Sequence, residues 1–131
     1  MGVTIELTRM EHAKEILEFE IKNRDFFESV IPPRPNSYYD IDNLKKIIKA
    51  IINEQEQGLC YMYIVRNEEG DMVGRVNLYS IYRSIYQKAE IGYRIGKDYN
   101  GRGYATKAIG LACNKAFNEH KLHKIEAGTS V

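Results

Sequence analysis

The sequence predicts an α/β domain with a mixed, mostly antiparallel central sheet and helices on both faces. Some segments alternate apolar and polar residues, as strands do, and others repeat apolar residues at helical spacing. Three of the predicted strands are joined by links too short for a crossover, so they must pair antiparallel. The length of 131 residues suits a single domain, residues 1–131, with one site.

The N-terminal half predicts a strand, a helix, a loop and a second helix. The strand is "VTIEL", and Thr8 with Glu11 resembles a capping box that opens the first helix. The stretch "FFESVIPPRPNSYYD" holds all three prolines and predicts an ordered aromatic loop, a candidate pocket wall. For the second helix, the N-cap is Asp40 or Asp42 and Gly58 follows the end. The apolar sides of the two helices are Ala13, Ile16, Leu17 and Ile21, and Leu44, Ile47, Ile48, Ile51 and Ile52.

The C-terminal half predicts a hairpin, a third strand, a helix and a last strand. The hairpin joins "LCYMYIVRN" to "MVGRVNLYSIY" through "EEGD", and "AEIGYRIG" continues the sheet. The helix runs from about Tyr104 to Glu119 and has a stripe of small residues that allows close packing on the sheet. The segment "HKIEAGTSV" predicts the last strand.

Composition excludes several classes of function. The 19 basic and 18 acidic residues nearly balance, so no bulk field attracts nucleic acid or an anionic membrane. Cys60 and Cys113 lack metal-ligand spacing, and we predict no metal site. No apolar run approaches the ~20 residues of a membrane span. We therefore expect a cytoplasmic protein.

The stretch "DYNGRGYAT" places Gly101 and Gly103 just before the last helix. A helix N-terminus offers unpaired N–H groups, and glycines let a phosphate approach them. A plain strand-to-helix turn is the simplest alternative. A dinucleotide-binding loop is another, with Glu126 as its acidic residue, but Thr106 replaces the third glycine.

Taken together, "AEIGYRI" and "NGRGYATKAI" resemble the GNAT superfamily of acyl-CoA-dependent N-acetyltransferases, and the branch that fits best is the RimJ/RimL-type ribosomal-protein N-acetyltransferases. The resemblance also covers the element order and "NRDFFESVIPPRP". The chain lacks the Gln or Arg with which the superfamily's loop pattern begins, and Arg102 is a partial substitute.

The resemblance implies the site residues. The strand backbone at Tyr93, Arg94 and Ile95 would bind the thioester and pantetheine. The loop would bind the diphosphate through Asn100, Gly101, Arg102, Gly103, Tyr104 and Ala105. Glu90 would be the catalytic general base; a structural pairing with Arg94 is the alternative. Substrate-binding residues would be Phe27, Arg34 and Tyr38, beside Pro32, Pro33 and Tyr39. We expect surface or capping roles for His120 and His123.

The resemblance implies acetyl-CoA as co-substrate and direct acetyl transfer to a primary amine, foremost a protein N-terminal amine or otherwise a small amine. Two alternatives stay open, a nucleotide-binding oxidoreductase and a non-catalytic CoA-binding domain. The branch continues beyond the segment that matches "HKIEAGTSV" with a helix that supplies the thiol's acid. We therefore expect a chain truncated at the C-terminus or completed by another subunit, and a homo-oligomer stays open.

Overall fold

Five strands form one sheet in the order β1-β2-β3-β4-β5 in this computed structural model, which describes residues 2–30, 32–82 and 87–127. The first four pair antiparallel, and β4 pairs with β5 in parallel, so the predicted mixed sheet is confirmed. The strands are β1 (Thr4–Leu7), β2 (Tyr61–Arg66), β3 (Met72–Tyr82), β4 (Lys88–Ile95) and β5 (Lys124–Ala127).

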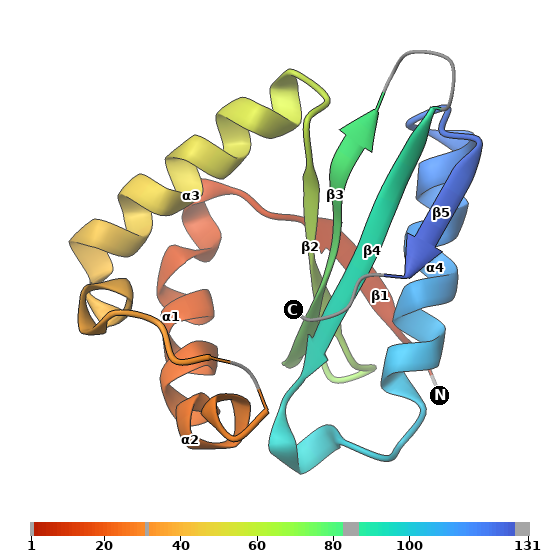
Figure 1. Ribbon diagram of the computed structural model, residues 1–131. Coiled ribbons are helices and arrows are strands. Elements are labelled where there is room, and N and C mark those ends of the chain that lie inside the picture. The colour runs from red at the N-terminus through yellow and green to blue at the C-terminus, as the bar shows by residue number, and fades with distance from the viewer. Residues whose placement is uncertain (1, 31, 83–86, 128–131) are drawn as a thin grey trace.

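Helices cover both faces of the sheet, as the sequence predicts (Figure 1). On one face lie α1 (Ala13–Lys22), α2 (Arg24–Glu28) and α3 (Ile41–Glu56). On the other lies α4 (Tyr104–Asn118), which connects β4 to β5. Short 3₁₀ turns at Met10–His12, Asn36–Tyr39 and Lys97–Tyr99 complete the described elements. The end of the predicted last strand, residues 128–131, lies outside the described residues.

The start of the first helix differs from the prediction. Thr8 does not cap it: its hydroxyl is buried without a hydrogen-bond partner, and the backbone N–H of Arg9 instead donates to His12 Nδ1 at 2.9 Å. Ile21 is 52% exposed, because the buried stripe of α1 runs through Ala13, Ile16 and Glu20, and the residue after Glu20 is rotated by about 100°.

The second predicted helix is confirmed as α3. The Asp40 carboxylate accepts from the Asn43 N–H at 3.0 Å and is the N-cap, and Gly58 has a left-handed φ of 74° just past the end. Before it, the predicted loop is partly helical: Phe26 and Phe27 belong to α2. Their side chains pack on the apolar cluster under α1, and this burial favours the short helix.

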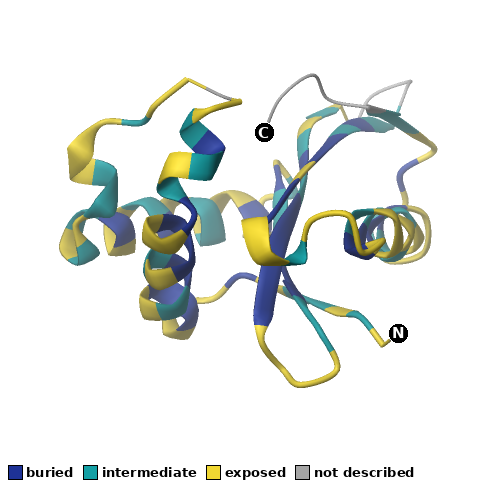
Figure 2. Ribbon diagram, turned by 90° about the horizontal axis from the view of Figure 1, so that it is seen from below, coloured by how far each residue is buried: buried dark blue, intermediate teal, exposed yellow. Residues whose placement is uncertain are grey.

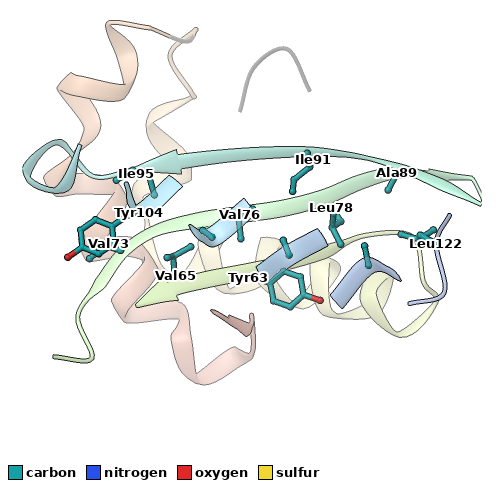
Figure 3. Packing of buried hydrophobic residues seen from close by; sticks show 13 residues of the cluster. Tyr63, Val65, Val73, Val76, Leu78, Ala89, Ile91, Ile95, Tyr104 and Leu122 are labelled. Carbon is teal, nitrogen blue, oxygen red and sulfur yellow. The ribbon is translucent and has the colours of Figure 1, made fainter. Parts of the chain in front are cut away.

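The α4 face of the sheet is packed with small residues against branched ones. Ala108, Ala112 and Ala116 are fully buried on the sheet side of α4. They meet Val73, Val76 and Leu78 of β3, together with side chains from β2 and β4 (Figure 3). Alanine lets the helix lie close to the sheet. Figure 2 shows buried residues concentrated on the strands and on the helix sides that face them.

Candidate active site

The C-terminal half of β4 forms the centre of the candidate site. In the register of the described residues, β5 pairs with β4 only from Lys88 to Ile91. Beyond Ile91, and among the described residues, the segment Gly92–Ile95 pairs with β3 alone. Backbone N–H and C=O groups of this segment that point away from β3 have no strand partner in the described part of the chain, and such groups can pair with an extended ligand as at a sheet edge.

A cavity of about 160 Å³ lies beside this segment. Tyr93, Arg94 and Ile95 line it from β4, and Asn100 lines it from the following loop. Phe26, Phe27 and Val30 close it from the α2 region. The structure thus brings four of the predicted cofactor residues together with Phe27, one of the predicted substrate residues.

The glycine loop ends at the N-terminus of α4. Gly101 and Gly103 have left-handed φ values of 78° and 81°, and a Cβ added at either would meet no atom within 4 Å. The N–H of Lys107 donates to the Gly103 carbonyl at 3.2 Å, which leaves the earlier N–H groups of the first turn without an intrahelical acceptor. This arrangement can bind an anion through the main chain.

Tyr104 occupies a different place from the other predicted loop residues. Its ring is 9% exposed and packs edge-on against Tyr99, with centroids 5.9 Å apart. Only its backbone can face a ligand, whereas Ala105 is half-buried. The Arg102 guanidinium lies 6.0 Å from the Tyr99 ring centroid and is exposed. The Tyr93 side chain is 43% exposed, whereas Ile91 and Ile95 of the same strand are buried.

Asn23 fixes the path of the chain between β4 and the glycine loop. Its Oδ1 accepts from the Lys97 N–H at 2.9 Å, and its Nδ2 donates to the Phe19 carbonyl at 2.9 Å. A Cβ on Gly96 would lie only 3.3 Å from the Asn23 amide. The end of α1 therefore holds the start of this loop.

Glu90 lies half-buried on β4, on the sheet face that carries α1 and α3. It is opposite Tyr79 of β3 and opposite Glu126 of β5. Burial, and secondarily the charge of Glu90, raises the pKa of Tyr79. The alternative pairing of Glu90 with Arg94 is not found, because Arg94 donates to Glu20 at 2.8 Å. Glu126 lies near Lys88 and Lys124, at 3.6 Å and 3.4 Å.

A buried cluster of charges lies between α1 and the sheet. Glu20 is 1% exposed, and its carboxylate accepts from Arg94 at 2.8 Å, from Arg34 at 3.0 Å and from Arg75 at 3.3 Å. Burial opposes the charge of Arg75, but Tyr38 and Glu20 outweigh it and raise its pKa; burial lowers the pKa of Arg94. Both guanidinium groups stay protonated at neutral pH.

A second cavity, of about 210 Å³, lies between α3 and the sheet. Arg34, Tyr38, Arg75 and Asn77 line its polar side, and apolar residues of α3 with Met62 line the rest. The predicted substrate residues are thus divided, since Phe27 lines the first cavity and Arg34 and Tyr38 line the second. Ile47 and Ile51 of α3 are half-buried because they border this space.

The remaining predicted loop and histidine residues lie away from both cavities. Pro32 and Pro33 are exposed, and Tyr39 stacks under Arg24 at 4.1 Å. His120 stacks on Tyr61 at 3.5 Å between centroids and hydrogen-bonds the Tyr63 hydroxyl at 2.6 Å, near the C-terminal end of α4. His123 is exposed.

Sequence reasoning missed Glu20, Asn23, Arg75 and Asn77. Glu20 had a usable signal, since it lies four residues after Ile16 and seven after Ala13, on the apolar side of the first helix. Arg75 and Asn77 interrupt the apolar run of β3 two residues apart and therefore share a face. Asn23 has no comparable signal, because its partners are backbone groups distant in sequence.

The described residues contain no group of three His, Cys, Asp or Glu side chains that could hold a metal ion. Within the same part of the chain, every helix is too short or too polar to cross a membrane.

A family-wide profile described as "Acetyltransferase (GNAT) domain" matches residues 3–131. The Probable N-acetyltransferase YjcK of Bacillus subtilis is 37% identical over 130 residues, which cover 97% of this chain and 72% of that protein. Among solved structures, the ribosomal-protein-S5-alanine acetyltransferase of Vibrio fischeri has a TM-score of 0.89 at 20% identity, covering 97% and 70% of the two chains.

A Mycobacterium smegmatis RimJ structure in complex with CoA-disulfide has a TM-score of 0.85 at 20% identity, over 95% of this chain and 61% of that one. The structural matches confirm the predicted fold, and the family match confirms the predicted resemblance and enzyme class, N-acetyltransferase. Acetyl-CoA is the predicted co-substrate, and it is the one that GNAT enzymes use. The oxidoreductase alternative finds no support in these comparisons.

Proposed function

Since the chain belongs to the GNAT acetyltransferase domain family, we propose that it moves an acetyl group from acetyl-CoA to a protein N-terminal amine by direct displacement. The observation that carries the proposal is the segment Gly92–Ile95 of β4, which pairs only with β3 among the described residues and continues into the glycine loop at the N-terminus of α4. One straight ligand can follow both, with its thioester on the strand and its diphosphate on the loop.

In this proposal each part of the site has one task. Backbone groups of Tyr93 to Ile95 hold the pantetheine arm and orient the thioester carbonyl. The N–H groups from Gly101 to Ala105 bind the diphosphate, and Asn100 lines the cavity between the two. Glu90 takes a proton from the acceptor, directly or through water.

These groups account for the attack of the amine and the removal of its proton. The lone pair of the neutral amine attacks the thioester carbonyl, the C–N bond forms, and the C–S bond breaks as the coenzyme A thiolate leaves. Glu90 receives the proton that the amine loses. An acceptor near Glu90 also lies on the sheet face that carries Arg34 and Tyr38, and this favours a substrate-side role for those residues. Relatives include enzymes named for ribosomal proteins, which favours a protein N-terminus as acceptor.

The test is an acetylation assay with acetyl-CoA and three acceptors: a peptide with a free N-terminus, the same peptide with a blocked N-terminus and an internal lysine, and a polyamine. We expect the mass of one acetyl group on the first alone. Acetylation of only the blocked peptide or the polyamine would overturn the N-terminal assignment. If none of the three acceptors is acetylated and calorimetry detects no binding of acetyl-CoA, both the proposed catalysis and the alternative of a non-catalytic CoA-binding domain are rejected.

Replacing Glu90 with Gln should lower turnover by about 10²-fold, because loss of a general base typically costs 10²–10⁴. The Michaelis constant for acetyl-CoA should hardly change, and the acidic limb of the pH profile should disappear. Glu126→Gln is the matched control, since Glu126 is on the neighbouring strand at the same level and lies near two lysines. Equal losses for both variants would assign Glu90 a general electrostatic role.

A further inference from the structure

The second cavity contains polar atoms that nothing in the described chain satisfies. Arg75 Nε and Asn77 Oδ1 are buried and have no hydrogen-bond partner, and both side chains line the cavity. The Arg75 side chain is only 7% exposed. An unsatisfied buried group typically costs about 1–3 kcal/mol, so proteins rarely keep one without a purpose. The residues that carry this donor and this acceptor line the same cavity, which points to a ligand with both kinds of group.

The charge of the cavity indicates which ligand. Arg34 and Arg75 line it, and among the described residues they share the carboxylate of Glu20. That carboxylate also accepts from Arg94, so it is divided among three guanidinium groups. Because positive charges outnumber the one carboxylate, the cavity favours an anion and disfavours a cation. Guanidinium groups match carboxylates best, because two N–H groups can bind the two oxygens together.

The cavity is placed to be reached by an acceptor whose amine lies at Glu90. Along β3, Arg75, Asn77 and Tyr79 share one face, and their partners on β4 are Arg94, Gly92 and Glu90. Gly92 has no side chain to separate Glu90 from Asn77. Four residues along β3 span about 13 Å at ~3.3 Å per residue. Arg75 therefore lies about 13 Å along the strands from the level of Glu90. A dipeptide whose amine lies at Glu90 can span this length with its second side chain.

We propose that this cavity selects amine acceptors that carry a carboxylate, specifically peptides with an acidic side chain at the second position. The guanidinium groups of Arg34 and Arg75 donate to the carboxylate, and the side-chain carbonyl of Asn77 accepts a backbone N–H of the peptide. The aliphatic stem of the side chain lies against the isoleucines of α3. This inference rests on the proposed N-terminal acetylation and adds the sequence that it prefers.

Three tripeptides that differ only at the second residue test the proposal: Ser-Glu-Ala, Ser-Gln-Ala and Ser-Lys-Ala. Wild-type kcat/KM should be about tenfold or more higher for Glu than for Gln, and lowest for Lys, because charge-assisted hydrogen bonds are the strong ones. Equal rates for all three, or a preference for Lys, would overturn the inference while leaving N-terminal acetylation intact. Free glutamate as a fourth acceptor shows whether a small amino acid supplies the same chemistry.

Variants connect the preference to the cavity. Arg34→Gln should reduce the Glu-over-Gln ratio several-fold, because only the glutamate side chain offers a carboxylate to that guanidinium. Asn77→Leu should instead lower kcat/KM for all three tripeptides by a similar factor, because Asn77 contacts the peptide backbone that they share. Arg24→Gln is the matched control: its side chain is 34% exposed against 30% for Arg34, both stack on a tyrosine ring, and Arg24 lines neither cavity. If Arg24→Gln lowers the ratio as much, the cavity is not the selector.

A binding measurement keeps the two proposals separate. If no tripeptide is acetylated, the proposed function fails, and the dissociation constants of Ser-Glu-Ala and Ser-Gln-Ala by calorimetry still decide the inference. Tighter binding of Ser-Glu-Ala that is lost in Arg34→Gln supports the cavity. Equal binding of both peptides, or none at all, rejects it.

Discussion

The two faces of the sheet are built on different principles. On the α4 face, the buried cluster is made of aliphatic side chains, alanines and two tyrosines. On the face that carries α1 and α3, Glu20, Arg75 and Arg94 are buried among apolar residues, and two polar atoms on the cavity lack partners. The α4 face therefore positions backbone, namely the glycine loop and the helix N-terminus, whereas the other face positions charged side chains.

This difference has an energetic consequence. The α4 face gains stability from dense packing, which is sensitive to volume and insensitive to pH. The charged face gains little net stability from its ion pairs, because desolvation offsets their attraction, but it is sensitive to the loss of any one partner. Ligand selectivity is expected where the chain keeps charges that folding alone does not require.

The largest expected effect comes from removing the shared carboxylate. Glu20→Gln should lower the free energy of unfolding by about 3–5 kcal/mol, because it leaves buried guanidinium groups uncompensated. Urea denaturation measures it. Glu28→Gln, which breaks the more exposed pair with Arg24, should cost no more than ~1 kcal/mol. If the two variants lose equal stability, the Glu20 carboxylate contributes less to the buried guanidinium groups than the short distances between them indicate.

The α4 face should respond to volume instead. Ala112 is fully buried against the sheet, so Ala112→Leu should cost about 1–3 kcal/mol by overpacking. Ala50 is exposed on α3, and Ala50→Leu should stay within ~0.5 kcal/mol of wild type. Thermal unfolding of both variants makes the comparison. A tolerated Ala112→Leu would show that α4 can move away from the sheet.

Periodic features of the sequence were sufficient to predict most of the fold. The meander follows from three strands with short links, and α3 follows from five apolar residues at helical spacing with Asp40 before them. The start of α1 was mispredicted because Thr8 and Glu11 match the local pattern of a capping box. In the structure the helix begins later, at Ala13, and His12 Nδ1 accepts the hydrogen bond from the Arg9 N–H. Local patterns cannot show that this threonine will be buried by the tertiary fold.

The arrangement of the candidate site was predictable only where a local motif marks it. Gly101 and Gly103 adopt the left-handed conformation that a glycine-rich loop suggests. The cluster around Glu20 joins residues 14, 55 and 74 positions apart, so no spacing rule reveals it. A charged residue on an apolar helix side was the only trace, and its partners depend on the tertiary fold.

The proposed role of the α4 N-terminus predicts a backbone effect at Gly103. Gly103→Val should weaken acetyl-CoA binding by about 1.4 kcal/mol or more, a tenfold loss, because the new side chain fills the space that the diphosphate would approach. Gly70→Val in the β2–β3 turn is a matched control: its φ is 85°, and a Cβ there also meets nothing within 4 Å. Calorimetry that finds equal affinities for both variants would reject the phosphate site.

The smallest expected effect tests whether that end of α4 acts through backbone or through charge. Arg102 is exposed and lies 6.0 Å from Tyr99, so its attraction for a diphosphate is screened by solvent and salt. Arg102→Ala should weaken acetyl-CoA binding by only about two- to fivefold, and the difference from wild type should shrink as ionic strength rises. A loss as large as that of Gly103→Val, persisting in high salt, would mean that the guanidinium carries the site. The two faces of the sheet would then both act through charged side chains, and the contrast between them would reduce to packing alone.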